Sequence, residues 1–243
     1  MQSPKHHILL FGGTGICGTI FTRAALEAGH TLTLYVRTPS KIPSDITSNP
    51  NIHVIQGEYG DEEGLKKAAA CGASVFVSMA GPTLGQKGGM PITKALTTLY
   101  PHLLTHSFSR ILILSTASYS APEDTRSLKW WVSINMYIRI LPGDAYDEIR
   151  GMAQATVDLG EKIKWTVFRV PLLIGEELGE KKGGKGGGGE AKGEEEREVE
   201  ACYVGDRKGR DGLILDRGRL ARWVLNEIEE GKWVGACPLL SNA

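Results

Sequence analysis

The chain is poor in several features that direct proteins to specialised classes. Its 243 residues include only four cysteines, and none of them belongs to a Cys-x-x-Cys pair. Scattered thiols of this kind are typical of a reducing compartment, and they outline no metal site. Lys plus Arg and Asp plus Glu number 28 each, so no excess of one charge points to nucleic acid or to an acidic membrane as a partner.

Long hydrophobic runs are also missing. No stretch approaches the roughly 20 apolar residues of a membrane span. The first apolar run is too short for a secretory signal and ends at Gly12. We therefore expect a soluble, cytoplasmic protein without a membrane partner. A hydrophobic content of 41% suits one ordinary core, so residues 1–243 are predicted to form a single domain of unspecified oligomeric state.

What the chain does contain is a regular alternation of apolar and amphipathic stretches. Apolar runs predict strands at residues 7–11, 31–36, 52–56, 73–79, 110–115 and 164–170. Helical patterns fall between them at residues 16–28, 61–70, 91–107, 146–159 and 216–230, with Gly29 as a helix stop and Asp216 as an N-cap. This alternation predicts an α/β fold, a doubly wound parallel sheet with helices on both faces.

Two insertions interrupt the alternation. Residues 127–142 are bulky and apolar and include Trp130, Trp131 and Tyr137. These aromatic side chains either line a pocket for an apolar or aromatic substrate or form a packed helix face, and we favour the pocket. Residues 179–200 are rich in Gly, Lys and Glu, with no large apolar side chain up to residue 197, so we expect a flexible low-complexity loop. The chain beyond this loop is predicted to form a small C-terminal portion on the substrate side.

A glycine-rich turn follows the first predicted strand. The stretch Gly13-Thr14-Gly15-Ile16-Cys17-Gly18 fits the spacing G-x-G-x-x-G, and Gly12, Gly15 and Gly18 fit the variant G-x-x-G-x-x-G. Glycine permits a tight turn and the close approach of a ligand, and the N-terminus of the next helix attracts a pyrophosphate. Because the motif joins a strand to a helix, it indicates a dinucleotide site rather than a turn without a ligand. The Cys17 thiol is interpreted as a small packing group, not as a reactive one.

The second predicted strand ends at Arg37, where an NAD site usually has an acid. That acid, about 20 residues past the glycines, binds the ribose 2′-OH. A guanidinium instead suits a 2′-phosphate, which a carboxylate would repel. Arg37, with Thr38, Ser40 and Lys41 just beyond it, therefore predicts NADP(H) as the cofactor. The alternative is that Arg37 is only a solvated charge at a strand end.

Several stretches, taken in order, resemble one known family. The segments ILLFGGTGICG, LYVRTPSK, VIQGEYGDEEGLKKAAACGASVFVSMAG, RILILSTASY and IKWTVFRVPLL are similar to the atypical short-chain dehydrogenase/reductases, specifically the NmrA-like and related NAD(P)H-binding proteins. The resemblance covers most of the chain apart from the two insertions. It implies a Rossmann fold with NADP(H) along the C-terminal edge of the sheet. It further implies that Glu58 and Tyr59 lie near the adenine, Ala80 and Gly81 near the ribose, and Val170 and Pro171 near the nicotinamide.

Catalytic residues are less well marked. Reductases of the wider superfamily use a Tyr-x-x-x-Lys pair and an upstream Ser or Thr, and this chain has no such pair. Its nearest match is Tyr146 with Arg150, which keeps the positive charge but not the compact ammonium of lysine. Tyr146 would exchange a proton with the substrate, assisted by Ser115 or Thr116, or by Ser118. Alternatively, Tyr146 is an ordinary helix residue and Arg150 a surface charge.

Three functions are compatible with these residues. The leading one is an NADP(H)-dependent oxidoreductase that acts on a small organic carbonyl or alcohol. The NmrA resemblance also allows an NADP(H)-binding regulator or redox sensor without turnover, and the fold also supports non-redox enzymes. His6 and His7 begin the first strand, but they have no nearby carboxylate or cysteine in the sequence, so no metal site is expected there.

Overall fold

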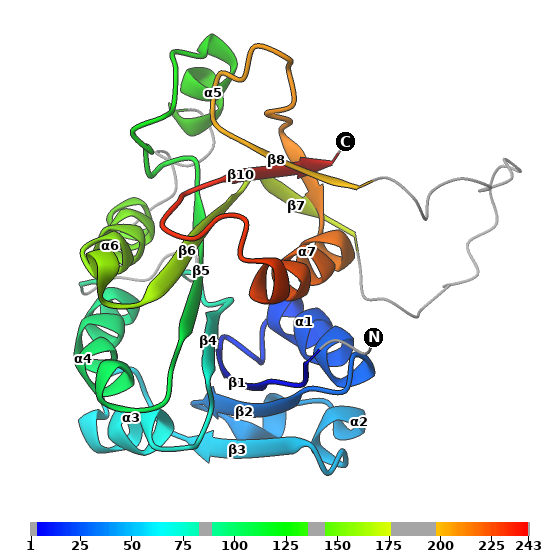
Figure 1. The fold of residues 1–243 in the computed structure, drawn as a ribbon, viewed down its shortest axis with the longest axis vertical. Helices are drawn as coiled ribbons and strands as arrows, with labels where there is room; N and C mark the ends of the chain where they lie inside the picture. Colours follow the sequence, from blue (N-terminus) through cyan, green and yellow to red (C-terminus); the bar gives the residue numbers. More distant parts are fainter. Residues whose placement is uncertain (1–3, 83–88, 136–143, 176–197, 243) are drawn as a thin grey trace, which may run out of the picture.

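A central parallel sheet organises the computed structural model, which describes residues 4–82, 89–135, 144–175 and 198–242. The strand order is β3-β2-β1-β4-β5-β6-β10-β8 (Figure 1). These strands are β1 (His7–Phe11), β2 (Thr31–Val36), β3 (Ile52–Gln56), β4 (Val75–Ser78), β5 (Arg110–Thr116), β6 (Lys164–Val170), β8 (Val199–Cys202) and β10 (Leu239–Asn242). Neighbouring strands are parallel except for β8, which runs antiparallel to β10. The predicted doubly wound α/β fold is therefore confirmed.

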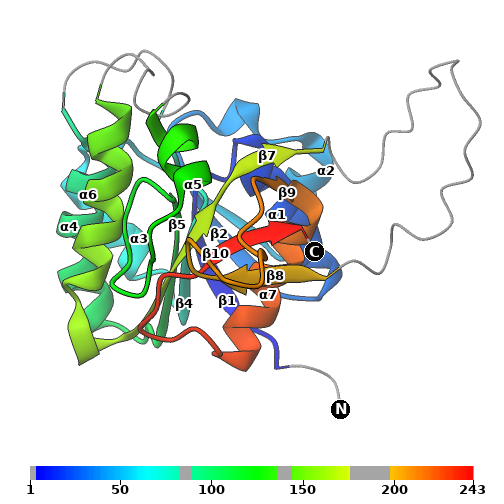
Figure 2. The same cartoon turned by 90° about the horizontal axis from the view of Figure 1, so that it is seen from above.

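Helices cover both faces of this sheet (Figures 1 and 2). One face carries α1 (Ile16–Glu27) and α7 (Arg217–Glu230), and the other carries α3 (Glu62–Ala69), α4 (Pro91–Thr105) and α6 (Ala145–Val157). Successive side chains of β1 point to opposite faces of the sheet and pack into the two cores in turn. Leu9 and Phe11 belong to the core on the α3–α4–α6 side, while Ile8 and Leu10 belong to the core on the α1–α7 side.

The helix ends follow the chemistry expected of their residues. Gly29 closes α1 with a left-handed φ of 82°, and the His30 N–H donates to the Ala25 carbonyl at 2.9 Å. The Asp216 carboxylate accepts the Arg219 N–H at 3.0 Å and caps α7. The predicted helix stop and the predicted N-cap are therefore both confirmed.

All six predicted strands and five predicted helices are present, with ends that differ by two residues at most. The sequence patterns missed four short strands: β7 (Leu172–Ile174), β8, β9 (Ile214–Asp216) and β10. They also missed the short helices α2 (Ser44–Thr47) and α5 (Leu128–Ser133) and the single turns η1 (Pro39–Lys41) and η3 (Gly160–Lys162). Each of these elements is too short to show a clear hydrophobic period.

The end of the second insertion is a correction to the sequence prediction. Val199 and Glu200 were expected in the flexible loop, but they belong to β8, where they pair with Asn242 and Ser241 of β10. Residues 179–197 of that predicted loop lie outside the described part of the chain. Beyond it, β8, α7 and β10 extend the main layers, and only β9 joins β7 in a separate two-stranded sheet. In the described ranges, no helix is both long and apolar enough to cross a membrane.

Candidate functional site

The glycine turn is packed so tightly that two of its glycines have no room for a side chain. Gly12 has a φ of 78°, and a Cβ on it would lie 2.6 Å from the Ala80 nitrogen after β4. A Cβ on Gly18, in the first turn of α1, would lie 2.1 Å from the Gly12 carbonyl oxygen. The turn therefore brings β1, β4 and α1 into backbone contact, which only glycine allows.

The N-terminus of α1 opens from this turn. Gly15 is its N-cap residue, no side chain caps the helix, and its first turn contains no acidic residue. The Gly15 N–H donates to the Gly12 carbonyl at 3.0 Å, which closes the turn. The amides of the first helical turn, at Ile16, Cys17 and Gly18, are therefore available to an anion together with the positive end of the helix dipole.

A cavity of about 760 Å³ lies beside the turn at the C-terminal edge of the sheet. It brings together ten of the residues predicted to bind the cofactor: Gly12, Gly13, Thr14, Gly15, Arg37, Lys41, Glu58, Tyr59, Ala80 and Gly81. The sequence analysis also named Thr38, beside Arg37, but it missed the other lining residues: Tyr35, Val36, Gly57, Gly60, Met79, Pro91 and Ile92. Tyr35 and Val36 carried a usable signal, since they end the second predicted strand and ligands of open α/β sheets bind at that edge. Pro91 and Ile92 come from α4, and nothing near them in the sequence indicates a ligand.

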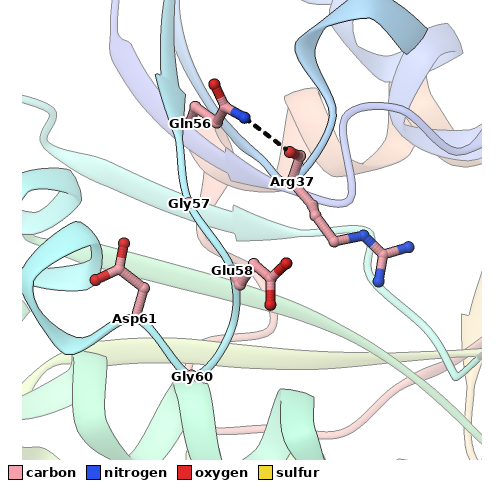
Figure 3. A pocket seen from close by; sticks show the side chains of 6 residues that line it. All are labelled: Arg37, Gln56, Gly57, Glu58, Gly60 and Asp61. Atoms are coloured by element: carbon pink, nitrogen blue, oxygen red, sulfur yellow. Dashed lines mark hydrogen bonds between the residues drawn. The ribbon is translucent and has the colours of Figure 1, made fainter.

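Two basic side chains lie on the β2 side of this cavity. Arg37 follows β2 directly and is exposed, and Lys41 ends the single turn η1. A second hollow of about 600 Å³ continues from Arg37 along the loop after β3, past Gln56, Glu58 and Asp61. In Figure 3 the Glu58 carboxylate points toward the Arg37 side chain, whereas Asp61 points away from it. Gln56 donates its side-chain amide to the Arg37 carbonyl at 3.4 Å, which ties the ends of β2 and β3 together.

Two tyrosines in the cavity wall are held in their neutral form. Burial raises the pKa of both Tyr35 and Tyr59 to about 12. Tyr35 donates its hydroxyl to the Glu58 carbonyl at 2.8 Å, and both rings contact Phe11, with centroids 5.0 and 5.7 Å away. These tyrosines therefore form a neutral, partly aromatic wall, suited to a flat ring rather than to proton transfer.

The remaining predicted cofactor residues lie outside the cavity lining. Ile16 is 58% exposed at the start of α1, and Val170 is buried in the core on the α1–α7 side at the end of β6. Pro171 connects β6 to β7. Burial raises the pKa of the Cys17 thiol, and the charge of the Arg217 guanidinium opposes this effect. Cys17 is therefore a protonated, partly packed thiol.

The predicted catalytic tyrosine and arginine lie close together on α6. The Arg150 guanidinium carbon is 5.4 Å from the centroid of the Tyr146 ring, within the range of a cation–π contact. Their spacing of one helical turn places them on one face of the helix. The geometry therefore brings the two predicted residues into contact.

The hydroxyls at the end of β5 are engaged within the protein. Ser115 is fully buried and donates its hydroxyl to the Ile149 carbonyl of α6 at 3.3 Å. Thr116 donates its hydroxyl to the Ser118 hydroxyl at 2.9 Å and accepts the Ser118 N–H at 3.2 Å. Ser115 thus lies on the α6 side of the sheet, while Thr116 is part of a local turn.

Glu148 is a buried carboxylate between the two predicted catalytic residues, and sequence patterns did not reveal its role. Its oxygens accept the N–H groups of Ile92 at 3.3 Å and Thr93 at 2.7 Å, and also the Thr93 hydroxyl at 2.7 Å. The N-terminus of α4, which reaches the cavity through Pro91 and Ile92, is therefore already capped by an anion. A phosphate is accommodated better at the uncapped N-terminus of α1.

The two tryptophans of the first insertion differ in their surroundings. Trp130 is buried in a small cluster with Ala117, Val204 and Leu239, and its indole N–H donates to the Asp211 carbonyl at 3.1 Å. It follows the packed-face alternative, because its indole finds both apolar cover and an acceptor there. Trp131 is 64% exposed on α5, and Tyr137 lies outside the described residues.

The histidines at the start of β1 are packed against other side chains. His6 stacks on His30, with ring centroids 5.7 Å apart, and lies 3.2 Å from a Glu229 carboxylate oxygen. His7 bonds the Thr33 hydroxyl at 2.8 Å. Across the described parts of the chain, no group of three or more His, Cys, Asp or Glu side chains could hold a metal ion.

Comparison with solved structures supports this architecture. A short-chain dehydrogenase/reductase (wide type) from Veillonella parvula DSM 2008, in complex with NADP, has a TM-score of 0.72 and 15% identity, covering 98% of this chain and 95% of that one. A putative epimerase from Bacteroides thetaiotaomicron has a TM-score of 0.68 and 18% identity, with coverages of 98% and 97%. ChuY, an anaerobillin reductase from Escherichia coli O157:H7, has a TM-score of 0.63 and 13% identity, with 96% of each chain covered. At these identities the likeness establishes the fold.

The sequence itself identifies the family. No curated protein gives a significant match. The profile of the NAD(P)H-binding family, however, matches residues 12–201. This range begins at the first glycine of the turn, just after β1, and ends within β8. The chain therefore belongs to the NAD(P)H-binding family, and its fold is of the Rossmann type.

Proposed function

We propose that this protein is an NADP(H)-dependent oxidoreductase that acts on a small organic carbonyl or alcohol. The observation that carries the proposal is the cavity in which the glycine turn meets Arg37 and Lys41. Two cations at the end of β2 suit a 2′-phosphate, and no carboxylate ends that strand. The preference for NADP(H) over NAD(H) is part of this proposal.

The residues of the site fit such a cofactor. The space next to Gly12 and Gly18 is too small for a Cβ, so the backbone of the turn can approach a pyrophosphate closely. The uncapped first turn of α1 supplies amide donors, and the neutral wall of Tyr35 and Tyr59 suits an adenine. When bound, the nicotinamide supplies or accepts the hydride.

The proton is assigned to α6. We infer that Tyr146 donates it to the substrate oxygen, or accepts it in the reverse direction, as a positioned general acid–base group does. The Arg150 guanidinium lies over the Tyr146 ring and so helps to position it. Ser115, which holds the Ile149 carbonyl, positions α6 against the end of β5. On substrate binding the Thr116 hydroxyl turns from Ser118 toward the same oxygen.

A regulator that binds NADP(H) without turnover is the second candidate. The observation that favours it is the engagement of the Ser115 and Thr116 hydroxyls with Ile149 and Ser118. A hydroxyl committed to the protein does not polarise a substrate carbonyl. A cofactor site without a working hydroxyl at β5 is what a sensor needs.

Steady-state oxidation of NADPH against a panel of aldehydes, ketones and quinones distinguishes the two. We expect turnover with at least one carbonyl, and Tyr146→Phe should lower it roughly 100-fold or more while NADPH affinity is kept. Tyr203→Phe is the matched control, because Tyr203 contacts Trp233 and is not part of the cavity lining. Unchanged turnover in Tyr146→Phe would refute the assignment of the proton donor. NADPH binding without turnover on any carbonyl would favour the regulator.

A further inference from the structure

Arg217 is the first residue of α7, a helix that the sequence analysis did not connect with the cofactor. Helix α7 packs against α1 on the same face of the sheet, and hydrophobic side chains of both helices share one core (Figure 1). The first turns of both helices lie near each other, since the Arg217 charge acts on the Cys17 thiol in the first turn of α1. The N-terminus of α7 therefore lies beside the glycine turn.

One hydrogen bond holds the Arg217 guanidinium at this place. Its Nη1 donates to the Gly175 carbonyl at 2.6 Å, just after β7. The Arg217 charge also acts on the thiol of Cys17, which carries one of the first-turn amides of α1. The cation therefore lies near the amides that attract a phosphate. The bond to Gly175 uses only one of the five N–H donors of a guanidinium.

The position of Arg217 is electrostatically unfavourable without an anion. A cation in the first turn of a helix opposes the helix dipole, and neither α1 nor α7 has an acidic residue in its first turn. The nearby Asp216 carboxylate caps the Arg219 N–H of α7. In the described part of the chain, Arg217 forms no ion pair with a carboxylate. The uncapped positive end of α1 and a guanidinium thus lie close together.

We propose that Arg217 binds the pyrophosphate of the cofactor from the α7 side, opposite the cavity that contains Arg37. A guanidinium matches two phosphate oxygens in geometry and charge, and so offsets the repulsion described above. The inference rests on the proposed cofactor site, but it assigns the two arginines to different groups. Arg37 recognises the 2′-phosphate, which only NADP(H) has, whereas Arg217 recognises the pyrophosphate, which both dinucleotides share.

Calorimetric titration of the Arg217→Met variant tests this assignment. Methionine keeps much of the apolar stem and removes the charge. We expect the affinities for NADPH and NADH to fall by a similar factor, about 10- to 100-fold. Arg222→Met, an exposed change on the same helix, should leave both affinities unchanged. Unchanged affinities in Arg217→Met, or a loss confined to NADPH, would overturn the assignment.

Adenosine 2′-monophosphate separates a binding role from a structural one. This fragment has the 2′-phosphate but no 5′-phosphate, so it lacks the group that Arg217 would bind. Arg217→Met should bind it as the wild type does, whereas a site distorted by loss of the Gly175 contact would bind it weakly, and that result refutes the proposal. If the methionine variant does not fold, Arg217→Lys serves instead. It keeps the charge without the paired donors, and it should weaken both dinucleotides equally but less.

The result is independent of the proposed preference and activity. If the wild type binds NADH as tightly as NADPH, the role proposed for Arg37 is refuted. Arg217→Met is still expected to lower the affinities for the two dinucleotides by a similar factor. If Tyr146→Phe turns over normally, the assignment of Tyr146 as proton donor is refuted. The calorimetric titrations of Arg217→Met do not depend on that assignment. The role proposed for Arg217 is tested only by the change in dinucleotide affinity in its own variants.

Discussion

Gly15 and Gly18 belong to the same motif, but only one of them is short of space. A Cβ on Gly18 would lie 2.1 Å from the backbone oxygen of Gly12, so α1 must shift away from the turn in Gly18→Ala. We expect a loss of about 1–3 kcal/mol in the free energy of unfolding, as for other overpacked sites, and a loss of NADPH affinity. Urea unfolding and calorimetry measure the two effects.

Gly15→Ala is the matched control within the motif. Its Cβ would meet the Gly12 oxygen at 3.5 Å, an ordinary contact, and its φ of −82° suits any residue. Its unfolding free energy should change by no more than about 0.5 kcal/mol. Equal destabilisation by both variants would show that backbone crowding at Gly18 is not the cause.

Arg37 determines cofactor preference in our account. The wild type should bind NADPH more tightly than NADH, and Arg37→Ala should weaken NADPH by about 10- to 100-fold with little effect on NADH, because a single charge-assisted contact is lost. Exposed Arg207, after β8, supplies the control variant Arg207→Ala. Equal affinities of the wild type for the two cofactors would contradict the prediction.

At the scale of elements, the second insertion ends where β8 begins. We expect that replacing residues 179–197 by a short Gly-Ser linker leaves the melting temperature nearly unchanged, since their composition cannot build a core. Extending the replacement to residue 200 removes Val199 and Glu200, which pair with β10, and should lower the melting temperature by several degrees. A similar loss in the shorter replacement would mean that the insertion itself contributes to stability.

A buried ion pair joins β6 to the segment between β5 and α5. Arg169 is fully buried and donates to both Asp124 oxygens, at 2.6 and 2.8 Å. Asp124→Ala leaves the guanidinium without its counterion, so the free energy of unfolding should fall by about 3–5 kcal/mol. The exposed pair of Arg23 and Asp45 gives the contrast, because Asp45→Ala should change chemical unfolding very little. Comparable losses in the two variants would contradict a dependence on burial.

For the whole molecule, stability should depend on pH through His30, which is buried, and His7, which is half-buried. Burial lowers the pKa of His30 and of His7 below the ordinary value of 6.5. The unfolded chain therefore takes up protons at a higher pH than the folded one. This contribution is complete above about pH 6.5, and it is lost as the pH falls through the folded pKa values.

We expect the melting temperature to fall between about pH 7.5 and 5.5, where these histidines take up protons. His30→Asn should flatten the dependence, because Asn can still accept the His6 N–H but does not titrate. His106→Asn is the control, since His106 is exposed. A pH profile that is the same in His30→Asn and in the wild type would assign the effect to other groups.

Local chemistry in the sequence was sufficient to predict most of the layers and the centre of the site. The apolar runs of β1 and β2 and the amphipathic pattern of α1 have their own periods, and Gly29 and Asp216 carry their own capping chemistry. The glycine turn was predicted for the same reason, since its spacing and its place between a strand and a helix lie within one short stretch. Arg37 and Lys41 follow in sequence, so their place at the cavity was also accessible.

Contacts between distant segments were decided by the tertiary structure alone. β8 and β10 are strands because they pair with each other and because β10 also pairs with β6. Short strands depend on their partners more than on their own residues. The indole of Trp130 donates to the carbonyl of Asp211, and the Glu148 carboxylate accepts an N–H at the start of α4. In both cases the partner is far away in the sequence. Arg217 lies 200 positions from Cys17, and no local period or motif links them. Their contact exists because α1 and α7 share one face of the sheet, and burial of that shared core is a property of the whole fold.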